Sequence, residues 1–188
     1  IEFLEKQKFG NHVEFDRILI DENSLRSSSY SSKGRLSRAI LSLYASRDPR
    51  DWENTNRSVL SDVYYILTDK PNLHHVFPIN YINNNKGQNR YDSNSLMNIA
   101  YLTQITNLHI SDRNPLNYIQ EYTQDGFDKV LYSHYISTSL LDWVRMDEMP
   151  ETALDIFINE RIENIITDLR IKLSDIKFEV VDTAESSL

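Results

Sequence analysis

Hydrophobic positions recur at helical intervals along most of the chain. The first clear case is the segment 33–46, where Leu36, Ile40 and Leu43 lie on one helical face. The Asp-Pro pair at 48–49 ends this helix, because a residue that precedes proline is disfavoured in the helical region. The same spacing predicts further helices over four ranges: 54–68, 127–136, 139–145 and 150–173.

The longest predicted helix carries an unbroken apolar stripe. The members of this stripe share one face and are Leu154, Ile158, Ile162, Ile165, Leu169 and Leu173. Pro150 falls in the first turn, where a proline is tolerated. Such a stripe is either buried in a core or forms a seam with another domain.

The pattern changes in the stretch 72–117. This stretch contains 11 Asn residues, which is typical of turns and caps rather than of long elements. Short strands fit at 73–77 and 99–102. A helix is expected to begin near the Ser-Asp pair at 111–112, with Pro115 in its first turn.

The composition favours one folded, mainly helical domain. Hydrophobic residues make up 40% of the chain and aromatic residues 11%, with 4 Gly and 5 Pro, whereas β-sandwiches normally use more Gly and Pro in turns. We therefore expect a mainly α fold with a small β hairpin. The expected organisation is an N-terminal arm or linker at 1–32, a helical domain at 33–175, and a C-terminal tail at 176–188 that begins with a short strand at 176–181.

The cysteine count limits the kinds of catalytic and metal-binding site that the chain can form. The chain has no Cys, which excludes a disulfide framework, a thiol nucleophile and a Cys-based zinc site. Any metal must therefore be bound by His, Asp, Glu or Asn. The longest stretch without charged residues, 93–111, is too polar for a membrane span, so we expect no membrane partner and a cytoplasmic location in a bacterium or archaeon. The start at Ile1, without Met or a signal pattern, indicates a piece of a longer protein.

The net charge of −8 argues at first against a nucleic-acid partner, because binding to phosphates needs Lys and Arg. The acidic residues are unevenly distributed, however. The segment 147–188 holds 11 acidic and 4 basic residues, so the rest of the chain is nearly neutral. Nucleic acid therefore remains an open partner for residues 1–146.

The dipeptide His74-His75 is the main candidate for a catalytic or metal-binding site. Neighbouring residues on a strand point to opposite faces, so an isolated pair of this kind usually comprises one packed and one surface imidazole. A bend at the strand end would instead bring both rings to one cleft. Downstream, Asn98 enters an apolar run and Asn107 follows nine residues later.

The order of two His, then Asn, then Asn resembles the His-Asn-His/Asn (HNH) nuclease motif. Three segments, 73–78, 98–99 and 106–119, are similar to the C-terminal nuclease domain of GmrSD-type, modification-dependent restriction endonucleases, and the likeness extends over about 30–175. The resemblance implies a ββα-metal motif embedded in a helical domain.

The resemblance also implies roles for individual residues. His75 is expected to be the general base, and Asn98, the other residue expected in the catalytic set, to support the loop and the base. His74 and Asn107 are expected to bind a divalent metal ion, with Mg²⁺ or Mn²⁺ favoured and Zn²⁺ also compatible. These residue types suit phosphodiester hydrolysis, because an imidazole with an ordinary pKa near ~6.5 can accept a proton from water at cellular pH.

Basic groups near the motif are the expected contacts to DNA phosphates: Lys86, Arg90, His109 and Arg113. Relatives often carry Lys or Gln where this chain has Ile79, and a basic residue where it has His109. Both departures remove an expected phosphate contact. They are expected to lower the affinity for the substrate more than the rate of the hydrolytic step. An ordinary solvated surface remains the alternative interpretation of these charges.

The sequence therefore predicts a metal-dependent DNA endonuclease domain, of the kind that restriction systems direct against modified or phage DNA. The resemblance implies that selectivity resides in an N-terminal sensor or NTPase domain of the same or a partner chain. Two alternatives stay open. The chain could be a non-catalytic helical module that binds another protein through the 154–173 stripe, with the His pair holding a loop, or an RNA-directed nuclease of the same fold.

Overall fold

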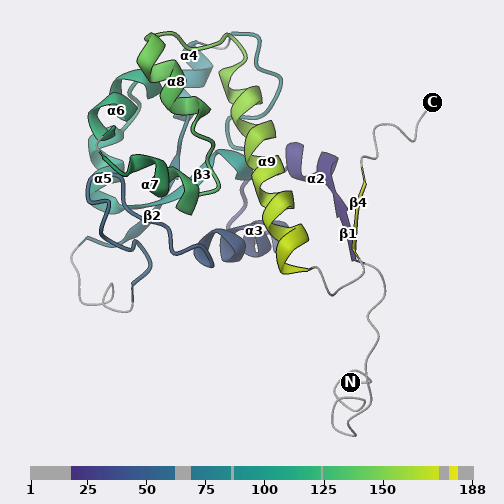
Figure 1. Cartoon of the computed structure of the whole chain (residues 1–188). Coiled ribbons are helices and arrows are strands. Elements are labelled where there is room, and N and C mark those ends of the chain that lie inside the picture. The colour runs from purple at the N-terminus through teal and green to yellow at the C-terminus, as the bar shows by residue number, and fades with distance from the viewer. Residues whose placement is uncertain (1–17, 62–68, 86, 124, 174–177, 182–188) are drawn as a thin grey trace, which may run out of the picture.

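The computed structural model describes residues 18–61, 69–85, 87–123, 125–173 and 178–181 (Figure 1). Its strands are β1 (Ile18–Asp21), β2 (Pro71–His75), β3 (Ile99–Thr103) and β4 (Phe178–Val181). Its helices are α2 (Glu22–Arg26), α3 (Arg35–Ala45), α4 (Ile79–Asn84), the 3-10 turn η2 (Leu96–Asn98), α5 (Gln104–Ile110), α6 (Pro115–Tyr122), α7 (Phe127–Ser133), α8 (Ser139–Met146) and α9 (Ala153–Lys172). The expectation of a mainly α fold with a small hairpin is confirmed: β2 and β3 pair antiparallel, and β1 pairs with β4 in parallel.

Helix α9 is the central element of the core. In Figure 1 it runs between the α5 to α8 side of the molecule and the side that holds α2 and the β1–β4 pair. The stripe predicted from the sequence lies inward, with Leu154, Ile158 and Ile165 all 0% exposed. These side chains pack against buried groups of α2, η2 and the later helices. The first four residues of the stripe, up to Ile165, are therefore internal, whereas Leu169 and Leu173 are only partly buried.

One charged side chain lies at the centre of this core. Arg161 of α9 is 0% exposed and donates to the carbonyl oxygens of His134, Met97 and Ile99 at distances from 2.6 to 3.1 Å. The ring of Tyr44 lies 4.1 Å from its guanidinium carbon. Because a buried cation is stable only when its donors are satisfied, this cage fixes α9 against the start of β3.

The two ends of the described chain belong to the domain. Residues 18–32 were expected to form an arm or linker and 176–188 a tail, but β1 pairs with β4 along its length and Leu25 is buried in the core. The Tyr30 amide also donates to the Asn94 carbonyl at 2.8 Å. The expected separation is wrong for the described parts of both segments, because each has a packing partner. The expected strand at 176–181 is confirmed over Phe178–Val181.

The expected helix at 54–68 is wrong over residues 54–61, which form turns; its remainder lies outside the described residues. The buried carboxylate of Asp51 accepts from the Asn54 amide at 3.2 Å, and Arg57 reaches Asp69 at 2.6 Å. These side-chain contacts stabilise a turn in place of helical hydrogen bonds.

The helix expected from 111–112 begins later. Asn114 caps α6 through the Leu116 amide at 3.0 Å, with Pro115 in the first turn. Ser111 instead follows the end of α5 with a positive φ of 49°. Across the described ranges, no helix has both the length and the apolar character that a bilayer crossing requires.

Replacement of Arg161 by Met should lower the free energy of unfolding by about 3 kcal/mol or more, because three buried carbonyl oxygens lose their donors. Urea denaturation followed by circular dichroism measures this change. The matched control is Arg145→Met, which removes a side chain that is 70% exposed and paired with Asp142 and should cost less than about 1 kcal/mol. Equal losses in the two variants would contradict the role assigned to Arg161.

Candidate functional site

The β2–β3 hairpin and α5 bring the predicted residues together. His74 pairs with Ala100 and His75 with Ile99 at the end of the hairpin. Thr103, the last residue of β3, caps α5 by accepting from the Thr106 amide at 3.4 Å, so the helix starts directly from the strand. Because α5 packs back against β2, Asn107 comes to lie opposite His74.

His74 and Asn107 are in direct contact. The distance from His74 Nδ1 to Asn107 Oδ1 is 2.8 Å. His74 is 3% exposed, and burial lowers its pKa to about 4, so its imidazole is neutral at pH 7. A neutral imidazole is the form that binds a metal ion.

The second nitrogen of the same ring lies in an aromatic pocket. His74 Nε2 is buried and has no hydrogen-bond partner in the described part of the chain. The rings of Trp52 and Tyr118 pack edge-to-face against the imidazole, with centroids 6.0 and 5.9 Å away. An N–H group can lie against an aromatic face without a conventional hydrogen-bond acceptor. If Nδ1 of His74 bound a cation, the ring proton would be on Nε2, next to these aromatic rings.

His75 is oriented by a residue that the sequence analysis did not single out. Its Nε2 lies 3.0 Å from Asn94 Oδ1, and the Asn94 amide nitrogen also donates to the Tyr30 carbonyl at 3.3 Å. When Nε2 donates to Asn94, the lone pair of the ring is on Nδ1. This arrangement leaves one nitrogen of His75 able to accept a proton.

Both histidines line one hollow of about 340 Å³ at the end of β2. Its polar lining comprises His74, His75, Asn80, Asn107, Ser111 and Asp112. Both residues therefore contribute to its wall, although neighbouring residues of a strand point to opposite faces. The carboxylate of Asp112 accepts from Asn80 at 2.8 Å and is the acidic group of this lining.

Asn98 lies behind the hollow and fixes its shape. Its side chain is 0% exposed; Oδ1 accepts from the Phe77 amide at 2.8 Å, and Nδ2 donates to the carbonyls of Phe77 and Ser93 at 2.8 and 2.7 Å. The Val76 amide donates to the Asn98 carbonyl at 2.9 Å, and Tyr118 Oη donates to the Val76 carbonyl. Asn98 thus acts on the backbone that follows His75 and does not itself line the hollow.

The predicted phosphate contacts are not gathered at this hollow. Arg90 pairs with Asp155 at 3.4 Å, His109 with Glu53 at 2.6 Å, and Arg113 with Glu121 at 2.9 Å. None of these three lines the hollow, and Lys86 lies outside the described residues. Each described basic group is therefore locally neutralised by an acidic neighbour, which weakens its attraction for phosphate.

Two residues of the site were missed for identifiable reasons. Asn94 belongs to a short Asp-Ser-Asn sequence at 92–94 that reads as a turn, and its contacts to His75 and Tyr30 span 19 and 64 positions. Asp112 was interpreted only as a helix cap. No local pattern could have assigned either role, since both depend on how distant segments fold together.

The donor set fits a cation with few protein ligands. Among the described residues, no three His, Asp or Glu side chains are grouped to hold a metal ion. Two neighbouring ligands at about 2.1 Å from an octahedral cation such as Mg²⁺ lie about 3 Å apart, close to the 2.8 Å between His74 Nδ1 and Asn107 Oδ1. An imidazole and an amide oxygen can thus share an ion whose other positions are filled by water or substrate oxygens.

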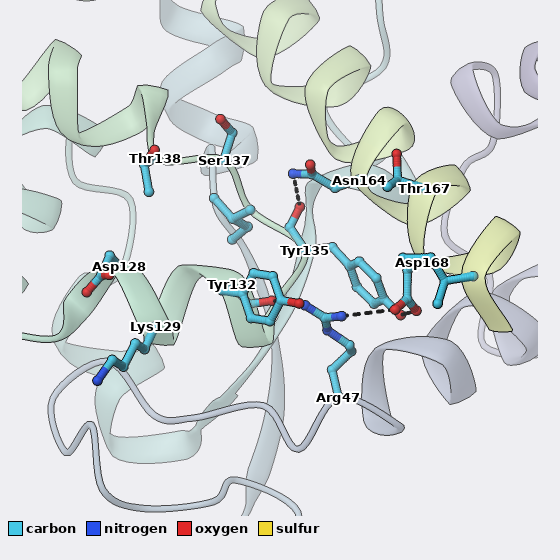
Figure 2. A pocket seen from close by; sticks show the side chains of 12 residues that line it. Arg47, Asp128, Lys129, Tyr132, Tyr135, Ser137, Thr138, Asn164, Thr167 and Asp168 are labelled. Atoms are coloured by element: carbon cyan, nitrogen blue, oxygen red, sulfur yellow. Dashed lines mark hydrogen bonds and ion pairs between the residues drawn. The ribbon is translucent and has the colours of Figure 1, made fainter.

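A larger hollow of about 470 Å³ lies between α7 and α9 (Figure 2). At its base Arg47 pairs with Asp168 at 3.1 Å, and its guanidinium carbon lies 3.9 Å from the Tyr132 ring centre. Of the residues that the sequence predicts for the site, none that the structure describes lines this hollow. The chemistry of the His pair is therefore separate from this hollow.

Comparison with known proteins adds no relative: no family model, curated protein or solved structure matches the chain.

Replacement of Asn98 by Asp should destabilise the fold by about 3 kcal/mol, because a buried carboxylate would face the carbonyl oxygens of Phe77 and Ser93 in place of an amide donor. Urea denaturation measures the loss. Asn117→Asp, an equivalent change at an exposed position of α6, should alter the free energy of unfolding by less than about 0.5 kcal/mol. Wild-type stability of Asn98→Asp would show that the contacts of this side chain do not hold the turn.

Stability should also depend on pH through His134. Its Nε2 donates to the Arg50 carbonyl at 2.7 Å, and burial lowers its pKa to about 4. Between pH 4 and about 6.5 the unfolded chain binds the proton and the folded protein does not, so the free energy of unfolding falls as the pH drops through this window. His74 contributes with the same sign.

Denaturation curves at pH 7 and pH 5 measure this dependence. His134→Gln, which keeps a donor near Arg50, should show a smaller difference between the two pH values than the wild type. Identical differences in the two proteins would rule out His134 as a source of the pH dependence.

Proposed function

We propose that the chain is a metal-dependent endonuclease domain that hydrolyses DNA phosphodiester bonds. The observation that carries the proposal is the contact of 2.8 Å between His74 and Asn107 beside His75, in one hollow. The order of β2, β3 and α5 agrees with the HNH-type ββα-metal motif that the sequence resembles. Such a site needs a pair of histidines, two paired strands and a helix, and this hollow is built from these parts.

His75 is assigned the role of general base. Its ring is held through Nε2 by Asn94, so that Nδ1 is the nitrogen that accepts a proton from the attacking water. Asn94 and Asn98 are positioning residues, since one orients the ring and the other fixes the backbone that follows it. Orientation of this kind is what a base needs to act on one bound water.

His74 and Asn107 are assigned to hold a divalent cation, with Mg²⁺ or Mn²⁺ favoured and Zn²⁺ compatible with an imidazole and an amide oxygen. When bound, the cation supplies Lewis-acid polarisation of a phosphoryl oxygen and of the leaving oxygen. The pair contributes no negative charge of its own. Asp112, in the same lining, is placed to attract the cation or to accept a hydrogen bond from its water.

Substrate affinity must come partly from outside the described hollow. Its lining contains no Lys or Arg in the described part of the chain, and the neighbouring cations are paired with acids. We therefore assign selectivity for modified or phage DNA to an N-terminal sensor or NTPase domain, on this chain or a partner. The competing hypothesis of a protein-interaction module loses support, because Leu154, Ile158, Ile162 and Ile165 are packed in the core and only Leu169 and Leu173 of the stripe are partly exposed.

The first test is nicking of supercoiled plasmid in the presence of Mn²⁺. His75→Ala should lower the rate at least about a hundredfold, because it removes the general base, while the circular dichroism melting curve stays close to that of the wild type. Asn107→Ala should lower both the rate and the affinity for Mn²⁺ in a calorimetric titration. Chelation with EDTA should abolish nicking by the wild type.

Arg145→Ala is the matched control, since this side chain is exposed on α8 and pairs only with Asp142 among the described residues; it should nick at the wild-type rate. Undiminished nicking by His75→Ala would exclude the proposed base. Parallel digestion of RNA distinguishes a nuclease of the same fold that prefers RNA.

A further inference from the structure

A second hollow, of about 380 Å³, adjoins the proposed site and shares Leu73 and His75 with it. Its lining includes Tyr30, Leu73, His75 and Tyr101. Leu73 and His75 share a strand face because they are two residues apart, and Tyr101 is the direct partner of Leu73 across the hairpin. The strand register therefore places Leu73, His75 and Tyr101 in the lining, and Tyr30 joins them from the loop that follows α2.

The lining combines two aromatic rings with an apolar floor. Tyr30 and Tyr101 are both partly buried against the core, and Ile99 forms part of the base of the hollow. Burial, followed by the nearby Tyr30 phenol, raises the pKa of Tyr101, which agrees with two neutral phenols close together. Within the described residues neither hydroxyl makes a hydrogen bond, so both retain donor and acceptor capacity.

This combination matches the chemistry of a nucleobase. A base presents flat π faces that stack on Tyr and an edge of donors and acceptors that pairs with hydroxyls. A purely apolar ligand would leave the two phenolic oxygens unpaired, which costs free energy. A phosphate would find no Lys or Arg among the described residues of the lining.

The two hollows are connected through shared residues and hydrogen bonds. His75 lines both of them. Asn94 contacts the His75 ring at 3.0 Å and the Tyr30 carbonyl at 3.3 Å, and its own carbonyl accepts from the Tyr30 amide at 2.8 Å. One residue thus fixes the distance between the proposed base and one wall of the second hollow.

We infer that the hollow lined by Tyr30, Leu73 and Tyr101 is a subsite for the nucleobase next to the phosphodiester that the His74–His75 site cleaves. The inference rests on the proposed function and deepens it. Because a paired base is stacked inside the duplex, the subsite selects a strand whose base at this point is unpaired or turned outward. Stacking on the tyrosine rings depends little on which base is bound, since every base has a π face.

The test compares two fluorescein-labelled probes of equal charge by anisotropy at low salt: single-stranded dT8, and an eight-unit strand of abasic residues. Wild-type protein should bind dT8 about tenfold more tightly than the abasic strand, within the range that stacking contributes. Tyr30→Leu and Tyr101→Leu should each reduce this ratio towards one, and Tyr101→Phe should preserve most of it.

The control is Tyr132→Leu, which removes a tyrosine that is 68% exposed on α7 and lines the Arg47 hollow instead; it should leave the ratio unchanged. Circular dichroism confirms that each variant is folded. Equal binding of the two probes by the wild type would overturn the subsite while leaving the nuclease proposal intact. A loss of the ratio in Tyr132→Leu would also overturn it, and failure to bind either probe would count against both proposals.

Discussion

The arrangement of the site depends on the carboxamide of Asn98. It hydrogen-bonds both backbone groups of Phe77, the second residue after β2, and so fixes the direction in which the chain leaves the strand. His74 and His75 are the last two residues of that strand, and both line the hollow beside this turn. Arg161 holds the other side of the same segment, because it binds the carbonyls of Met97 and Ile99 on either side of Asn98. A buried amide and a buried cation together therefore position two histidines.

The residues proposed to bind the cation carry little charge of their own. His74 is neutral because it is buried, Asn107 is uncharged, and Asp112 supplies the acidic group of the lining. The nearest arginines of the motif are engaged by Asp155 and Glu121. Under the proposed function, such a centre would hold a cation weakly until a phosphate contributed oxygens and negative charge, which would couple metal binding to substrate binding. The aromatic hollow beyond His75 would add affinity that does not depend on charge.

The sequence predicted the parts of this structure that depend on local pattern. The stripe of α9, the hairpin strands and the order of His74, Asn98 and Asn107 are all readable from spacing, and the structure brings His74 and Asn107 into contact. The helix that carries Asn107 was not foreseen, because the sequence placed this residue ahead of the helix at Pro115. The helix expected over 54–61 is replaced by a turn in which Asp51 accepts from Asn54, three residues away, and Arg57 reaches Asp69. Asn94 was not recognised because its partner His75 lies 19 positions away and is brought close only by folding.

Anomalous scattering from a crystal of the protein soaked in Mn²⁺ tests the central claim most directly. The account predicts a manganese peak in bonding contact with His74 Nδ1 and Asn107 Oδ1, with His75 beside it and outside the coordination shell. A well-ordered site in which the 2.8 Å hydrogen bond between these two atoms persists and manganese binds elsewhere, or not at all, would contradict it.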